Sequence, residues 1–499
     1  MRKLKFVYLI IFYIVEILSL NAFAQFIVPD FQVNKIPGSY PCRYRGPKIA
    51  VMSNGNFLIV WLYIRNNNFD VFGQWYNSNG KKINNNFKIN QFKGNTPIIN
   101  QSPNRKYVIV SWNEYAQLFY EDGSKIGDNI FLGKEMDMLH SIAINDNKEI
   151  LFAWSLYHGS DVFAQWIYSD GNPIIKPITI NDDKSICSRY RPNVQIFNDN
   201  SFIIVWEDER HGFLEFKIYA KSYFLYNLEF DKEFRVDTIV NFANCSNPCI
   251  AIDENGFFVI AWIDWREERY NVYAQKYTIE GKPIGSNFRV GNDSTNIILS
   301  NNAFSHTSIT CDDHSNYIIA WHDYKNEINA DLHAKLFSIN NDELYDLKIS
   351  QFNKRDQWDP DIKIFKNRLY SVWYDNRCND TGFDVWASVT ELPHLSKIIN
   401  NSQSNEKYCN LLEQNYPNPF NSQTIINYKV IESDQLSLQI FNINGKLIKN
   451  LVDSQHIIGE YSILWDATDD ENNKIASGVY FIKLKTTHHF EIKKIFFLK

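Results

Sequence analysis

Seven short apolar runs along the chain each end in a tryptophan, and they recur at a spacing of about fifty residues. Phe57–Trp61, Phe202–Trp206 and Phe258–Trp262 are clear copies. Because these runs are apolar at successive positions, both faces of each strand must be covered by other sheets. Short strands at this period predict a β-propeller, in which no repeat buries its apolar faces alone. The seven residues are Trp61, Trp112, Trp154, Trp206, Trp262, Trp321 and Trp373.

Each repeat divides into four strand-like segments, of which the second carries the tryptophan. The third centres on a small residue, as in Asp161–Gln165, and the fourth is a short segment such as Phe234–Asp237. The repeat around Trp373 has no fourth segment, whereas Phe31–Asn34 has that form and precedes the first repeat. We therefore expect an all-β fold in which an N-terminal strand closes a seven-bladed β-propeller over residues 25–391, since closure removes exposed sheet edges.

The first 24 residues have the order of a secretory signal peptide. Basic residues precede the apolar stretch Phe6–Leu20, and Ala22–Ala24 forms a small-residue cleavage pattern. A membrane anchor is the alternative, but the stretch is shorter than the roughly 20 residues of a membrane span and contains Glu16. We expect residues 1–24 to direct export.

The composition argues against several classes of function. With a net charge of -6 and no basic run, the chain has no surface that would follow a phosphate backbone, so we expect no nucleic-acid partner. The seven cysteines show no paired zinc-type spacing, and the chain has no Walker, Rossmann, HExxH or GxSxG motif. We expect a monomer with no cofactor and no metal site.

A polar segment over residues 392–410 separates the repeats from a C-terminal stretch with several ordered motifs. The motifs are Leu412–Asn421, Ile440–Gly445, Gly459–Tyr461, Ser477–Ile482 and the basic-apolar end Lys493–Lys499. In this order they resemble the type A C-terminal sorting domain of the type IX secretion system, over residues 411–499. By this resemblance, the residues of the sorting signal are Pro417, Asn418, Pro419, Gly445, Gly478, Lys493 and Lys494.

The resemblance implies a route for the protein. It implies signal-peptide export to the periplasm of a Gram-negative bacterium, then passage across the outer membrane, with release or attachment at the cell surface. It also implies that residues 411–499 contact the type IX secretion machinery. Strand-like segments such as Ser437–Phe441 and the turn pair Asn444 and Gly445 predict a small Ig-like β-sandwich here.

Charged residues recur in the loops after the tryptophan strands and in the loops that enter the blades, which the strand order places on one face of the propeller. We expect this face to bind an unknown glycan or protein. In a structural alternative, a repeated Trp-x-Asp-x-Arg motif pairs its charges across neighbouring blades and holds the loops. The candidate residues are Arg43, Arg45, Arg189, Arg191, Asp208, Arg210, Asp264, Arg266, Asp323, Asp375 and Arg377.

A glycoside hydrolase is the second alternative. Tyr44-Arg45 and Tyr190-Arg191, which lie just before prolines, resemble the arginine that opens the site of sialidase-like propellers, and nearby carboxylates could act as acid and base. The Ser-x-Asp-x-Gly-x-x-Trp box typical of that family is absent, because the tryptophan after Asp253–Gly256 follows the glycine by six residues instead of three. We therefore expect a non-catalytic binding module.

Overall fold

The computed structural model contains two compact units, one of residues 1–222 with 231–395 and one of residues 223–230 with 396–499. The described part of the chain contains β-strands and no helix, so it has no helix that could cross a membrane. The described residues are 25–34, 46–65, 68–95, 97–133, 140–155, 161–197, 201–212, 215–224, 232–238, 244–253, 256–266, 269–279, 281–292, 306–312, 314–325, 329–352, 354–378, 382–392, 411–430, 433–442, 445–486 and 490–498.

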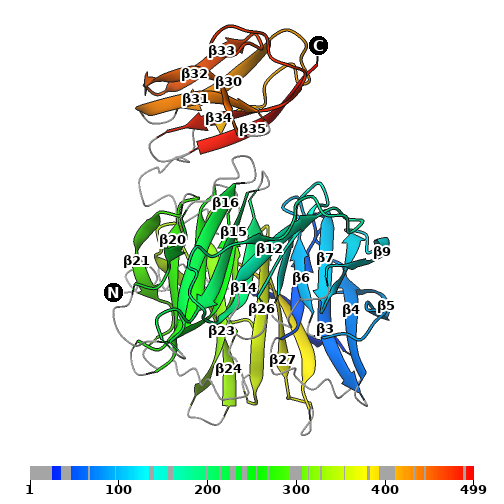
Figure 1. Cartoon of the computed structure of the whole chain (residues 1–499). Coiled ribbons are helices and arrows are strands. Elements are labelled where there is room, and N and C mark those ends of the chain that lie inside the picture. The colour runs from blue at the N-terminus through cyan, green and yellow to red at the C-terminus, as the bar shows by residue number, and fades with distance from the viewer. Residues whose placement is uncertain are drawn as a thin grey trace, which may run out of the picture. The chain divides into compact units, whose positions relative to one another are not determined.

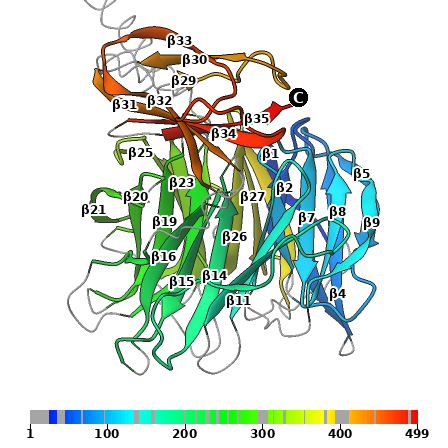
Figure 2. The same ribbon diagram turned by 45° about the horizontal axis from the view of Figure 1, so that its top comes forward.

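Within its described residues, the first unit contains seven four-stranded antiparallel sheets, which we number as blades 1 to 7 in chain order (Figures 1 and 2). Blade 1 consists of β2 (Lys48–Val51), β3 (Phe57–Arg65), β4 (Asn68–Tyr76) and β5 (Lys82–Lys88). Blade 2 consists of β6 (Ile98–Gln101), β7 (Tyr107–Trp112), β8 (Tyr115–Tyr120) and β9 (Lys125–Phe131). Blade 3 consists of β10 (Ser141–Ile144), β11 (Ile150–Ser155), β12 (Val162–Ile167) and β13 (Ile178–Thr179).

Blades 4 to 7 follow the same order of strands. Blade 4 consists of β14 (Arg189–Ile196), β15 (Ser201–Asp208), β16 (Lys217–Phe224) and β17 (Phe234–Arg235), and blade 5 of β18 (Cys245–Ile252), β19 (Phe258–Asp264), β20 (Asn271–Tyr277) and β21 (Pro283–Arg289). Blade 6 consists of β22 (Ser308–Cys311), β23 (Tyr317–Lys325), β24 (Asn329–Phe337) and β25 (Glu343–Leu347). Blade 7 consists of β26 (Gln357–Phe365), β27 (Arg368–Asp375), β28 (Asp384–Glu391) and β1 (Gln25–Gln32).

The blades form a closed ring around their first strands, which we term the inner strands. Each of β2, β6, β10, β14, β18, β22 and β26 contacts the next, and β26 contacts β2. In blade 7 the outer strand is β1, which pairs antiparallel to β28 with Phe31 opposite Ala387 and Gln32 opposite Trp386. Both ends of the propeller segment therefore share one sheet, and the predicted all-β class with repeated propeller sheets is confirmed.

The tryptophan strands are buried on both faces because each blade lies between two others. All eight residues of β15 are buried, as are all seven of β19. Trp262 packs in one hydrophobic cluster with Val205 and Ala220 of blade 4, so the small residue of one blade does leave room for the tryptophan of the next. Truncating such a buried tryptophan to alanine typically costs about 3–5 kcal/mol, which explains why the pattern repeats.

The second unit consists of two sheets whose side chains share one hydrophobic cluster around Trp465. The first sheet has the order β29 (Leu411–Leu412), β30 (Thr424–Val430) and β33 (Gly459–Trp465), and the second has the order β32 (Leu447–His456), β31 (Asp434–Asn442), β34 (Gly478–Lys485) and β35 (Phe490–Phe497).

Most of the predicted sorting residues lie on or beside the last strand of this unit, whereas Gly445 lies between β31 and β32. Asn418 accepts a hydrogen bond from the Phe496 backbone N–H at 2.8 Å, which joins the Pro417–Pro419 segment to β35. Lys493 and Lys494 lie on β35 itself, and Gly478 pairs with its end opposite Phe497. Gly445 occupies a turn with a positive φ of 72°, a conformation that glycine adopts without steric cost.

Candidate binding site in the axial cavity

The Trp-x-Asp-x-Arg motif forms a compact unit, here called a clip, in three blades. The indole N–H donates to the aspartate, the aspartate also accepts the backbone N–H and the guanidinium of the arginine, and the guanidinium lies over an aromatic ring on the next strand. The clips are Trp206, Asp208 and Arg210 over Tyr219 in blade 4, Trp262, Asp264 and Arg266 over Tyr273 in blade 5, and Trp373, Asp375 and Arg377 over Trp386 in blade 7.

The three clips have nearly the same dimensions. In blades 4, 5 and 7, the indole nitrogen lies 3.0, 2.9 and 3.1 Å from the carboxylate oxygen. A guanidinium nitrogen lies 2.6, 2.6 and 2.5 Å from the same oxygen. The guanidinium carbon lies 4.0, 3.8 and 4.1 Å from the ring centroid, within the range of a cation–π interaction. Charge-assisted hydrogen bonds and ring stacking therefore leave each aspartate fully engaged.

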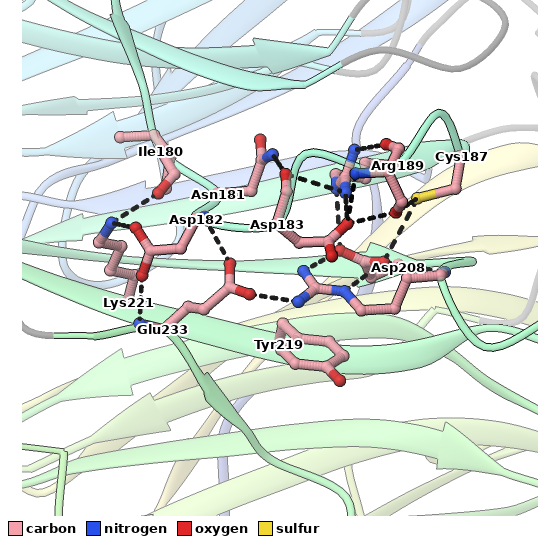
Figure 3. A network of polar contacts seen from close by, with 12 residues as sticks. Ile180, Asn181, Asp182, Asp183, Cys187, Arg189, Asp208, Tyr219, Lys221 and Glu233 are labelled. Carbon is pink, nitrogen blue, oxygen red and sulfur yellow. Dashed lines mark hydrogen bonds and ion pairs between the residues drawn. The ribbon is translucent and has the colours of Figure 1, made fainter.

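Blade 4 extends its clip with a second arginine (Figure 3). Arg189, only 1% exposed, donates to Asp208 at 2.9 Å and to Asp183 at 2.7 Å. Arg210 also pairs with Glu233. Burial by itself would raise the pKa of Asp208, but hydrogen bonds from Arg210 and Trp206 and the charges of both arginines lower that pKa to about 2. Asp208 is therefore ionised at neutral pH and acts as the centre of a buried ionic network.

The clip arginines pair within their own blades, which corrects the expectation that each Asp–Arg pair joins neighbouring blades. Arg377 bonds Asp375 and also Asp30, which lies on β1 of the same blade. The reason is local, because an aspartate two residues before another residue readily accepts that residue's backbone N–H in an Asx turn. Arg189 is the exception, since Asp183 lies on the loop that leaves blade 3.

In blade 6, a pair formed by Asp323 and His333 takes the place of the clip. Asp323 lies 2.9 Å from Nε2 of His333, and His333 stacks on Trp321 at 5.4 Å between ring centroids. A hollow of about 430 Å³ lies beside these rings. Several of its polar side chains already have partners, such as Gln357, which donates to Asp375 at 2.8 Å. We therefore do not assign the ligand site to this hollow.

The inner strands of blades 4, 5 and 7 carry a bulge just before a proline. Strand pairing shifts register around Arg191, Asn247 and Asp359, which have positive φ values of 49°, 53° and 53°. A residue before proline is normally extended, and a positive φ is costly for any side chain, least so for Asn and Asp. Bulges re-aim side chains and are frequent beside functional sites.

In blades 4 and 6, the central residue of the Trp-x-Asp run accepts a hydrogen bond from the bulge of the following blade. Glu207 is 1% exposed and accepts the backbone N–H of Asn247 at 2.6 Å and the guanidinium of Arg191 at 2.6 Å. In blade 6, Nδ1 of His322 accepts the backbone N–H of Asp359 at 3.3 Å. Burial lowers the pKa of His322, which favours the neutral ring that can accept this bond.

A cavity of about 130 Å³, the axial cavity, lies among the seven inner strands. Its polar lining includes Lys48, Asn100, Ser141, Arg191, Asn193, Gln195, Asn247, His306, Ser308, Asp361 and Lys363. Neither the nitrogen nor the oxygen of the Asn247 amide has a hydrogen-bond partner in the described part of the chain, although this residue is only 6% exposed. The side-chain oxygen of Asn193 is likewise without a partner there. The cavity therefore presents unused donors and acceptors.

Most of the residues predicted from the sequence lie either in the clips and their ion pairs or in the lining of the axial cavity. Of the candidate residues that the structure describes, only Arg191 lines the axial cavity, whereas Arg189 and the clip residues are engaged in ion pairs. Arg43 and Arg45 lie outside the described residues. The described arginines of the set do not converge on one tyrosine, the arrangement that would favour a sialidase-like site. Sequence reasoning missed Asn247, whose signal is its place before Pro248 at the start of an inner strand.

Residues 414–497 match the family model of the secretion system C-terminal sorting domain, which confirms the predicted resemblance. The fold and this domain together define the class: a β-propeller protein sorted by the type IX secretion system, which exports proteins to the cell surface or extracellular space in Bacteroidetes-type bacteria. A search of curated protein sequences finds no match.

Several solved structures are similar to the chain at low identity. One is the α-L-arabinofuranosidase Arb93A from Fusarium graminearum, at 11% identity and a TM-score of 0.43, covering 75% of this chain and 99% of that one. A polysaccharide lyase of family PL25, an ulvan lyase, has 10% identity and a TM-score of 0.46, covering 76% and 99%. PorZ, a surface component of the type IX secretion system of Porphyromonas gingivalis, has 12% identity and a TM-score of 0.38, covering 92% and 61%.

Proposed function

We propose that this exported protein is a non-catalytic binding module whose axial cavity recognises a glycan. The observation that carries the proposal is the Asn247 amide, which is buried and whose donor and acceptor have no partner among the described residues. An unpaired buried polar group costs about 1–3 kcal/mol. A ligand that supplies both an acceptor and a donor offsets that cost, and sugar hydroxyls supply both from one group.

The backbone of the site supports the same proposal. Asn247 is held at a φ of 53° before a proline, and buried Glu207 fixes its N–H. Strained residues persist where the surrounding structure determines them, and they gather at functional sites. Preorganised side chains also bind with a smaller loss of conformational entropy. These features support a role for the bulge in holding the amide in position for a ligand.

We propose the following organisation for the whole chain. Residues 1–24 are a signal peptide, residues 25–391 form the propeller, residues 392–410 are a linker, and residues 411–499 are the sorting domain, a small β-sandwich that contacts the secretion machinery. The mature protein acts as a monomer at the cell surface or outside the cell. Its ligand is a glycan, and a protein ligand is the alternative that the experiment below separates.

The variant Asn247→Gly tests the site without disturbing its backbone, because glycine adopts positive φ at no steric cost. We expect the purified full chain to bind members of a glycan array, and Asn247→Gly to weaken that binding about tenfold or more, the effect of one to two lost hydrogen bonds in a desolvated site. Asn84→Gly is the matched control, since Asn84 also has a positive φ of 60° but lies exposed on β5.

The outcomes separate the alternatives. Glycan binding that survives Asn247→Gly would place the site elsewhere, and a full chain that binds no glycan on the array would overturn the proposal in favour of a protein ligand. Incubation with a fluorogenic sialoside tests the hydrolase alternative, and we expect no release of the fluorophore. Turnover of that substrate would overturn the non-catalytic assignment.

A further inference from the structure

Cations outnumber carboxylates in the lining of the axial cavity. Lys48, Arg191 and Lys363 come from blades 1, 4 and 7, whereas Asp361 is the only carboxylate among the lining residues described. Asp361 already accepts hydrogen bonds from the Ile49 backbone N–H at 2.9 Å and from a serine hydroxyl at 3.0 Å. The lining therefore carries more positive than negative charge.

The three cations differ in how fully they are neutralised. Arg191 pairs with buried Glu207 at 2.6 Å, and the nitrogen of Lys48 comes only within 3.9 Å of Asp361. Lys363 has no carboxylate within ion-pair distance in the part of the chain that the structure describes. It follows Asp361 by two residues on β26, so both side chains point to the same side of the strand, along the cavity wall. One uncompensated positive charge thus remains in a confined space, where solvent screens it less than at the surface.

We infer that the ligand is an acidic glycan, recognised through an end unit that bears a carboxylate or a sulfate. This inference rests on the proposed function and names the ligand class for the same site. The anionic group neutralises the uncompensated charge of Lys363, while the sugar hydroxyls pair with the amides of Asn247 and Asn193. Neither group of residues alone accounts for the lining, because a free anion leaves the amides unused and a neutral sugar leaves the charge unused.

The size and chemistry of the cavity favour a chain end over other occupants. At about 130 Å³ it is smaller than the roughly 300–1,000 Å³ of pockets that enclose a whole drug-sized ligand. It therefore takes a terminal unit and leaves the rest of the glycan outside. A protein partner would instead be expected to bury aromatic or arginine anchors against apolar pockets, whereas amides, hydroxyls and cations supply half of the residues in this lining.

Titration calorimetry on the purified full chain tests the inference with three probes. Trigalacturonate supplies an anionic glycan, its methyl ester supplies the same sugar without the charge, and sodium sulfate supplies an anion without the sugar. We expect trigalacturonate to bind at least tenfold more tightly than its methyl ester, as one charge-assisted contact implies. We also expect its affinity to fall as salt is raised, and we expect sulfate alone to bind far more weakly.

Two lysine variants on one blade locate the charge. Lys363→Gln should reduce the affinity for trigalacturonate about tenfold and leave the affinity for the methyl ester unchanged. Lys366→Gln, at the exposed turn between β26 and β27, should leave both affinities unchanged. Thermal unfolding of both variants checks that each one is folded.

Each contrary result has a distinct meaning. Equal affinity for trigalacturonate and its methyl ester, or an unchanged preference in Lys363→Gln, overturns the inference and leaves the proposed glycan site standing. Sulfate that binds as tightly as trigalacturonate overturns it as well, because the cavity would then be an anion site only. A chain that binds neither these sugars nor any glycan on the array overturns the proposed function itself.

Discussion

The clips and the inner-strand bulges are two devices that recur around the same propeller, yet they treat their polar groups in opposite ways. In each clip, an aspartate with almost no exposure accepts hydrogen bonds from an indole, a backbone N–H and a guanidinium. At the bulges, the backbone is strained, and at Asn247 the side chain also lacks partners among the described residues. The polar groups of the clips are therefore paired within the protein, whereas the Asn247 amide at a bulge has no partner among the described residues.

The comparison assigns stability to the clips and ligand binding to the bulge at Asn247. A buried charge removed from its partners is strongly destabilising, so the stability of the fold accounts for the clips. An unpaired buried amide opposes folding, so its retention needs another reason, and ligand binding supplies one. In blade 4 the two devices share a strand, because Asp208 belongs to the clip and Glu207, one residue earlier, bonds to the bulge of blade 5.

Removing the central carboxylate of blade 4 should have the largest effect. Asp208→Ala leaves Arg189, which is 1% exposed, without its closest buried partner. We expect the free energy of unfolding to fall by about 3–5 kcal/mol, the usual cost of breaking a buried ion pair. Chemical denaturation of the full chain measures it, with the exposed residue Asp128 changed to alanine as the control. A loss below about 1 kcal/mol would mean that the clip behaves like a surface ion pair.

Acid should weaken the same clip by a smaller amount. The pKa of Asp208 in the folded state is about 2, below the value of 3.8 for an unperturbed aspartate. Its ionised form therefore stabilises the fold above about pH 4, and this contribution, about 2 kcal/mol, is lost as the pH falls from about 4 to about 2.

The variant Asp208→Asn isolates this titration from those of the other carboxylates. We expect the difference in unfolding free energy between the wild type and Asp208→Asn to be constant above about pH 4 and to shrink by about 2 kcal/mol on acidification to about pH 2. Denaturant titrations at a series of pH values give that difference directly. A difference that does not change with pH would contradict the lowered pKa of Asp208.

The fold was largely predictable because its signals are local and repeated. Apolar runs that end in tryptophan mark strands covered on both faces, and Phe31–Asn34 supplies the segment that blade 7 lacks. The clips were predictable in composition but not in pairing, although the spacing of Asp264 and Arg266 already permits a local Asx turn. The sorting domain was predictable because several motifs occur in one order.

The site was less predictable because it depends on side chains that lack partners in the folded protein. Tyr190-Arg191-Pro192 drew attention through its arginine, and Arg191 does line the axial cavity. Asn247 has the same position before a proline, but one asparagine among many carries no charge signal. Whether its amide has partners depends on strands from neighbouring blades, which no local pattern encodes. Lys363 was missed for the same reason, since only the closed ring shows that it faces the axis.

Two substitutions at Asn247 give the smallest and most specific test of the comparison. Asn247→Ala introduces a residue that disfavours the φ of 53°, whereas Asn247→Gly does not. Both remove the same unpartnered amide, so neither loses a hydrogen bond made by that side chain within the described protein. We expect Ala to lower the free energy of unfolding by about 1 kcal/mol relative to Gly, and Gly to remain within about 1 kcal/mol of the wild type. A glycine variant as unstable as Asp208→Ala would show that the bulge amide stabilises the fold as a clip does, and the distinction between the two devices would fail.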